Sequence, residues 1–152
     1  MSKADVVTTP EYWAAACAHL SKKDRVMKRL IPQFGDACLV SRGDAFVTLA
    51  RSIVGQQISV KAAQSVWNKF AALSKKITPA GVLKLKVDDM RAAGLSACKV
   101  EYLVDLALHF HGKTVHVKDW QHMDDEAIIE ELVAIRGIGR WTAEMFLIFH
   151  LM

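Results

Sequence analysis

Apolar residues recur every three or four positions along nearly all of this 152-residue chain. Such spacing puts them on one face of an α-helix, whereas a half-buried strand needs strict alternation, and the chain has no convincing stretch of it. The pattern is strongest after Gly43-Asp44, where its members are Phe46, Val47, Leu49, Ala50, Ile53 and Val54. We therefore predict an all-α fold, a compact helical bundle that forms one domain over residues 1–152.

Residues that favour helix starts divide the chain further. A Ser, Thr or Asp side chain at the N-cap accepts a hydrogen bond from a free N–H of the first turn, and proline is favoured at the first helical position. We expect helices to begin at Thr9-Pro10, Asp24, Asp44, Ser59, Thr78-Pro79, Ser96 and Asp124. The segment 24–34 carries Arg25, Lys28 and Arg29. A solvated helix face is the simpler interpretation of these charges, and direct contact with phosphate is the alternative.

Composition narrows the class of protein. Hydrophobic residues make up 52% and charged residues 24%, which are globular proportions that argue against intrinsic disorder. The net charge of +4 is compatible with a polyanionic partner but supports one only weakly. The longest apolar run, Met145 to Phe149, is too short to span a bilayer, and the N-terminal segment lacks the apolar core of a secretory leader. We expect a soluble protein of the bacterial cytoplasm, associated with the nucleoid, or of a nucleus.

The three cysteines, Cys17, Cys38 and Cys98, lie far apart. Their spacing matches neither a zinc site nor an iron–sulfur cluster. We expect them to be buried, reduced thiols, and nothing in the sequence requires a cofactor.

The stretch from Leu132 to Ala143, LVAIRGIGRWTA, is the most informative in the chain. Gly137 and Gly139 flank Ile138 between two predicted helices. Glycine reaches backbone conformations closed to other residues and keeps no side chain between the backbone and a phosphate. Ile138 can plug such a turn into the core, while the free N–H groups at the start of the next helix favour an anion. For the glycines alone, a purely helix-ending role is the alternative.

The full stretch resembles the DNA-binding helix-hairpin-helix motif, over about residues 124–150. A second stretch, SIVGQQISVKAA from Ser52 to Ala63, resembles the corresponding segment of the DNA-3-methyladenine glycosylase II family within the helix-hairpin-helix base-excision superfamily. Gly94-Leu95-Ser96, followed by Lys99 and Tyr102, is similar to a third segment, to which we assign no chemistry. The three segments keep the family's order, and the resemblance covers the chain from about residue 44 to its end.

The resemblance implies roles for individual residues. The hairpin residues Gly137, Ile138, Gly139, Arg140 and Thr142 would bind a phosphate of double-stranded DNA. The wedge, a side chain that enters the duplex where an extruded nucleotide had been, is best matched by Gln57, then by Gln56 and Ile58, and an ordinary polar connection between two helices is the alternative.

Two further sites follow from the same resemblance. Trp141 and Met145 would lie at the base pocket, because a tryptophan face attracts a cationic alkylated purine, although a core tryptophan is the rival interpretation. The backbone carbonyls of Val133, Ile135 and Gly137 would hold a structural monovalent cation.

The implied activity is monofunctional hydrolysis of the N-glycosidic bond of alkylated purines, such as 3-methyladenine, in damaged double-stranded DNA. The family's catalytic aspartate is expected beyond Met152, so we assign no catalytic residue within the chain and expect a C-terminally truncated, inactive fragment. Lyase chemistry is disfavoured because no lysine lies between Asp119 and Met152. A non-catalytic helix-hairpin-helix DNA-binding module and a helical scaffold protein are the alternatives. Lesion preference and oligomeric state are not predicted.

Overall fold

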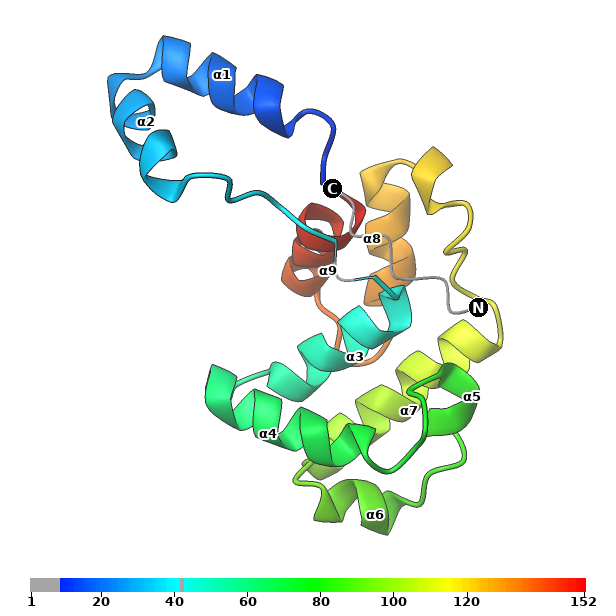
Figure 1. The fold of residues 1–152 in the computed structure, drawn as a ribbon. Coiled ribbons are helices and arrows are strands. Elements are labelled where there is room, and N and C mark those ends of the chain that lie inside the picture. The colour runs from blue at the N-terminus through cyan, green and yellow to red at the C-terminus, as the bar shows by residue number, and fades with distance from the viewer. Residues whose placement is uncertain (1–8, 42) are drawn as a thin grey trace.

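The computed structural model describes residues 9–41 and 43–152, and within these ranges it contains helices and no strand (Figure 1). The prediction of an all-α helical bundle is confirmed. Residues 1–8, which include most of the segment expected to lack a secretory leader, lie outside the described residues. The body consists of α3 (Ala45–Gly55), α4 (Val60–Ala71), α5 (Pro79–Val82), α6 (Val87–Ala92), α7 (Ala97–His111), a 3-10 turn, η2 (Trp120–His122), α8 (Asp125–Val133), α9 (Arg140–Phe146) and a short π-helix, η3 (Leu147–Leu151).

Helices α3 and α7 form the centre of the body. Helix α3 packs against α4, α7 and α9, and α7 also packs against α5 and α6. The face of α3 predicted from spacing is buried apart from the half-buried Val47, whereas Leu108 of α7, which the spacing also places inside, is 52% exposed. The core residues of these two helices are Ala45, Phe46, Leu49, Ala50, Ile53, Val54, Val100, Leu103, Leu106 and Ala107. Since α9, the last α-helix of the body, packs against α3, the first, segments far apart in the sequence meet there.

Side-chain caps start most of these helices. Asp44, Ser59, Thr78, Ser96 and Asp124 each accept a hydrogen bond from the backbone N–H three residues further on, as the sequence predicts. Helix α6 was not predicted, because its N-cap, Lys86, makes no side-chain cap hydrogen bond.

The N-terminal helices form an arm that stands away from the body in Figure 1. The arm consists of α1 (Trp13–Lys23), α2 (Arg25–Leu30) and a 3-10 turn, η1 (Ile31–Phe34). The helix expected at Thr9-Pro10 begins at Trp13, after a turn, and the helix expected over 24–34 changes to a 3-10 turn containing Pro32. Proline has no N–H to continue the α-helical hydrogen bonds.

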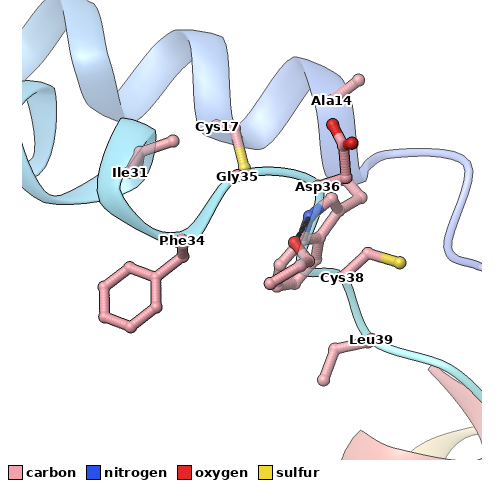
Figure 2. Close-up of a pocket in the computed structure, with 10 residues that line it drawn as sticks. Ala14, Cys17, Ile31, Phe34, Gly35, Asp36, Cys38 and Leu39 are labelled. Atoms are coloured by element: carbon pink, nitrogen blue, oxygen red, sulfur yellow. Dashed lines mark hydrogen bonds between the residues drawn. The ribbon is translucent and has the colours of Figure 1, made fainter.

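The arm's apolar side chains contribute nothing to the core. Within residues 9–41, α1, α2 and η1 have no buried residue. A hollow of about 580 Å³ lies between α1, η1 and the segment 36–39, and Figure 2 draws the residues that line it. Trp13 Nε1 donates a hydrogen bond to Ala37 O at 3.2 Å at this place. The basic side chains of α2 are exposed, in agreement with a solvated face.

Two expectations about the wider chain can be compared with the structure. Cys38 and Cys98 are exposed and Cys17 is half-buried, so the expectation of buried thiols is wrong, although all three are free cysteines. Cys17 lies on α1, Cys38 in the segment after η1 and Cys98 in the first turn of α7, and nothing in the described chain covers them fully. Among the described residues, no helix combines the length and the apolar character that crossing a membrane requires.

Candidate nucleic-acid interface

Helices α8 and α9 form a helical hairpin joined by residues 134–139. Two isoleucines anchor this turn in the core: Ile135 is 1% exposed and Ile138 is 3% exposed. The Ile138 N–H donates to Ile135 O at 3.1 Å, which closes the turn. Arg136, Gly139 and Arg140 are exposed, so one side of the turn is fixed inside the protein while the other meets solvent.

Glycine occupies the two hairpin positions, 137 and 139, for different physical reasons. Gly137 has φ +84°, in the left-handed region, and a Cβ there would lie 2.3 Å from Cδ2 of Tyr102. Gly139 has φ −92°, and a Cβ there would meet no described atom within 4 Å. The fold therefore requires glycine at position 137, whereas at 139 the space beside the backbone is open.

Gly139 is also the N-cap of α9 and has no side chain to accept hydrogen bonds from the first turn. The first N–H groups of an α-helix have no partner within the helix. The start of α9 therefore presents backbone donors and the positive end of the helix dipole on an exposed turn. This arrangement suits an anion such as a phosphate.

Arg140 is held by two carboxylates in the structure. Its guanidinium donates from Nη1 to Glu126 at 3.0 Å and from Nε to Glu144 at 2.9 Å. The hydrogen bonds that Arg140 donates to Glu126 and Glu144 raise the pKa of Arg140, and the bond from Arg140 lowers the pKa of Glu126. These pairs are exposed and screened by salt, so they can exchange for a phosphate at small cost.

The two adjacent glutamines in the loop between α3 and α4 have different surroundings. Gln56 turns inward, and its Nε2 donates to the backbone carbonyl of Gly137 at 2.8 Å. Gln57 is exposed and has φ +58°, an uncommon backbone conformation for a residue with a side chain, and Ile58 beside it is also exposed. The structure therefore brings the loop of the matched segment 52–63 and the hairpin turn into direct contact, through residues that are 81 positions apart in sequence.

Helix α7 lies beneath both loops. Lys99 Nζ donates to Val54 O at 2.7 Å and to Gln56 O at 2.8 Å, and burial lowers the pKa of Lys99. Tyr102, on the same face three residues later, packs its ring against Gly137. Sequence reasoning assigned neither residue a role. The signal was present in their matched segment and their spacing, but their partners could not be read from the sequence.

The residues expected at the base pocket are only partly gathered. Met145 and Thr142 line a hollow of about 190 Å³ between α9 and α3, whose other lining residues are Thr48, Leu49, Arg51, Ser52 and Phe146. Trp141 is 70% exposed and is outside the described lining of this hollow. The rival interpretation of Trp141 as a core tryptophan is wrong.

Two of the three carbonyls expected to hold a cation, those of Ile135 and Gly137, belong to the turn, and the third belongs to Val133, the last residue of α8. The Gly137 carbonyl accepts from Gln56 and the Ile135 carbonyl accepts from the Ile138 N–H. A carbonyl oxygen has two lone pairs, so each of these groups keeps one for an ion, and oxygen ligands suit hard cations. The donor set fits the expected monovalent cation, which stays a prediction.

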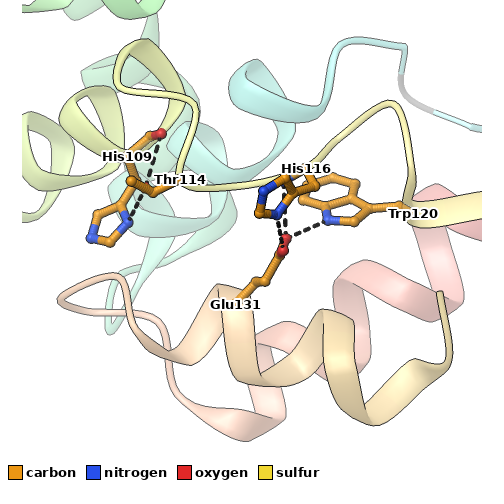
Figure 3. Close-up of polar contacts among 5 residues, drawn as sticks. All are labelled: His109, Thr114, His116, Trp120 and Glu131. Atoms are coloured by element: carbon orange, nitrogen blue, oxygen red, sulfur yellow. Dashed lines mark hydrogen bonds and ion pairs between the residues drawn. The ribbon is translucent and has the colours of Figure 1, made fainter.

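A polar cluster of His116, Trp120 and Glu131 connects the segment after α7 to α8 of the hairpin. Glu131 pairs with the His116 ring and accepts hydrogen bonds from the His116 backbone N–H at 3.0 Å and from Trp120 Nε1 at 2.9 Å (Figure 3). The hydrogen bond with Glu131 raises the pKa of His116. Burial raises the pKa of Glu131, but the bonds from Trp120 and His116 outweigh it and leave this pKa below its ordinary value.

Comparison with known proteins bears on this geometry. Residues 50–144 match the family model described as HhH-GPD superfamily base excision DNA repair protein. A curated relative, DNA-3-methyladenine glycosylase 1 of Schizosaccharomyces pombe, is 34% identical over 140 residues, which cover 88% of this chain and 61% of the relative. The DNA-3-methyladenine glycosylase of Saccharomyces cerevisiae is 36% identical over 115 residues, covering 69% of this chain and 39% of the relative. The chain thus spans less than two thirds of the length of these relatives.

Solved structures agree with these similarities. A DNA-3-methyladenine glycosidase from Bacillus halodurans is similar with a TM-score of 0.78 and 26% identity, over 95% of this chain and 67% of that one. The 3-methyladenine DNA glycosylase of Schizosaccharomyces pombe, solved in complex with abasic DNA, is similar with a TM-score of 0.75 and 33% identity, over 90% and 70% of the two chains.

Proposed function

Because this chain belongs to the HhH-GPD superfamily of base excision DNA repair proteins, we propose that it acts in the removal of alkylated purines from double-stranded DNA by hydrolysis of the N-glycosidic bond. The observation that carries this proposal is the bond between Gln56 and Gly137, which joins the loop suited to enter a duplex to the turn suited to hold a phosphate. The similar glycosylase of Schizosaccharomyces pombe is solved with abasic DNA, the product of such a reaction. The partner would be damaged DNA, in a bacterial cytoplasm or a nucleus.

The hairpin would hold the DNA backbone. The free N–H groups at the start of α9 and the open space at Gly139 support contact with one phosphate. Thr142 and Arg140, both in the first turn of α9, would add to this contact, Arg140 once it is released from Glu126. Ile138 would contribute indirectly, since its burial fixes the turn.

The loop after α3 would fill the gap left by an extruded nucleotide. Extrusion costs a few kcal/mol, and a side chain that takes the place of the base offsets part of that cost. Gln57 is exposed at the tip of this loop, with Ile58 next to it, whereas Gln56 is occupied by the hairpin. We therefore assign the wedge to Gln57.

The extruded base would lie near the hollow between α3 and α9. Met145 and Thr142 line it, and the exposed face of Trp141 is free to stack on a cationic purine. The described residues that line the hollow include no carboxylate, and Glu144, the carboxylate of α9, is paired with Arg140. We assign no catalytic residue within the chain.

This lining favours a second candidate, a module that binds DNA without excising a base. One experiment separates the two functions: the protein is incubated with alkylated duplex DNA, released 3-methyladenine is quantified, and binding to an abasic duplex is measured by fluorescence anisotropy. Release of the base together with abasic binding supports the glycosylase. Binding without release supports the second candidate, and the absence of salt-dependent binding would eliminate both.

A further inference from the structure

Lys99 lies at the meeting point of three segments. It belongs to the first turn of α7, yet its ammonium group reaches the end of α3, more than forty residues earlier in the chain, where it contacts the carbonyls of Val54 and Gln56. The last carbonyls of a helix have no partner within the helix, and they mark the negative end of its dipole. A lysine at this place therefore stabilises the fold in two ways: its ammonium group donates hydrogen bonds to these carbonyls, and its charge is favourable at the negative end of the helix dipole.

The same contact controls the direction in which the chain leaves α3. Gln56 is the C-cap residue, and its carbonyl immediately precedes Gln57 with its left-handed backbone. A second bond holds the side chain of Gln56 on the hairpin, so Gln56 is fixed at its carbonyl by Lys99 and at its amide by Gly137. With both ends of Gln56 held, Gln57 has little freedom to turn back toward the protein.

Tyr102 completes the arrangement from the same face of α7. Its ring lies against Gly137, the residue whose carbonyl receives Gln56. One face of α7, through Lys99 and Tyr102, thus sets the positions of both loops that the proposed function places on DNA.

We propose that Lys99 is a positioning residue that holds the loop of Gln57 in its outward conformation, so that the wedge is formed before DNA arrives. This inference rests on the proposed function, because it gives Gln57 the role of the wedge. Lys99 itself need not touch DNA. A preformed loop avoids the loss of conformational freedom that a mobile loop would suffer on binding.

The experiment compares Lys99→Met with Lys99→Arg and with Lys118→Met as a control on an exposed loop. Methionine keeps most of the apolar stem and removes the donors, whereas arginine can still donate to both carbonyls. Affinity is measured for an abasic duplex and for an undamaged duplex of the same sequence, and hydrogen exchange is measured at the amides of residues 56–58 without DNA.

We expect Lys99→Met to lower the preference for abasic over undamaged duplex by about tenfold, the effect of losing bonds to a charged donor. Exchange at residues 56–58 should accelerate, while Lys99→Arg should retain most of the preference and Lys118→Met all of it. In the Lys99→Met background, Gln57→Ala should have little further effect, because the wedge is already displaced.

Three results would overturn the inference: unchanged exchange at residues 56–58 in Lys99→Met, an unchanged preference for abasic duplex, or full additivity with Gln57→Ala. If wild-type protein binds neither duplex, the proposed function fails. The exchange data then decide on their own whether Lys99 holds the loop.

Discussion

Tyr102 packs its ring so closely over Gly137 that a Cβ at position 137 would lie 2.3 Å from Cδ2 and 2.4 Å from Cγ. The contact places α7 directly beneath the hairpin turn. It also explains why this glycine is required by the fold, before any contact with DNA is considered.

The two hairpin glycines should respond differently to alanine. Gly137→Ala meets Tyr102 and an unfavourable φ, so it should lower the free energy of unfolding by about 1–3 kcal/mol or more. Gly139→Ala has open space and an ordinary φ, so the free energy of unfolding in urea should fall by no more than about 1 kcal/mol, the cost of alanine at an N-cap. A duplex phosphate against the Gly139 backbone would be kept away by the new methyl group, so abasic-duplex affinity should fall. Unchanged affinity in a folded Gly139→Ala protein would contradict phosphate binding at this turn.

Neutralising Glu126 should release Arg140 toward DNA. Glu126→Gln removes the carboxylate that holds the guanidinium, so duplex affinity should increase and its salt dependence should become steeper by about one unit of slope. Glu11→Gln, an equal change of charge on an exposed residue before the arm, controls for net charge. An equal response of both variants in anisotropy titrations would show that Arg140 makes no phosphate contact.

The pair of His116 and Glu131 predicts a pH dependence of stability. The pKa of His116 is raised above 6.5, so its share of the stabilisation is complete below that pH and disappears as pH rises through the raised value. The pKa of Glu131 is lowered below 4.5, so its share is present above that pH and disappears on further acidification. His116→Asn should therefore lower the melting temperature more at about pH 5.5 than at about pH 8.5.

His111→Asn, on an exposed residue at the end of α7, is the matched control for that measurement. A loss that is the same at both pH values would mean that the charged form of His116 has no part in holding the loop onto α8.

The hairpin carbonyls predict an effect of monovalent cations. If Val133, Ile135 and Gly137 hold such an ion, replacing potassium by tetramethylammonium at constant ionic strength should weaken duplex binding, because a bulky organic cation cannot enter a ring of carbonyls. Titrations in the two salts measure this directly. Equal affinities in the two salts would show that duplex binding does not depend on a cation at these carbonyls. The proposed contact between the N–H groups at the start of α9 and a phosphate would be unaffected.

Local chemistry made much of the fold predictable. Ser59 or Ser96 caps a helix through an N–H only three residues away, so sequence alone identifies the boundary. The buried face of α3 follows from spacing in the same way, whereas on α7 the spacing also places Leu108 inside and the structure leaves it exposed. Helix α6 could not be predicted because Lys86 offers no capping oxygen. The exposure of the arm could not be predicted because spacing does not say whether another element covers an apolar face.

The candidate site was predictable only where one short segment carries the whole feature. Gly137, Ile138 and Gly139 act through their own turn, and their motif is legible in the sequence. The roles of Lys99 and Tyr102 depend on partners in other helices, and the distinction between Gln56 and Gln57 depends on a bond that spans 81 residues. Such long-range pairings arise from packing and have no local signature.

The amide of Gln56 has one further consequence. It bridges the two exposed loops by a hydrogen bond of 2.8 Å, and Lys99 and Tyr102 of α7 support the same two loops, so their separation is fixed by direct contacts between them and one helix. Duplex DNA lying on this surface would meet two protein loops at a fixed distance from each other. A displacement of either loop would therefore be transmitted to the other through Gln56, without the unpacking of a helix.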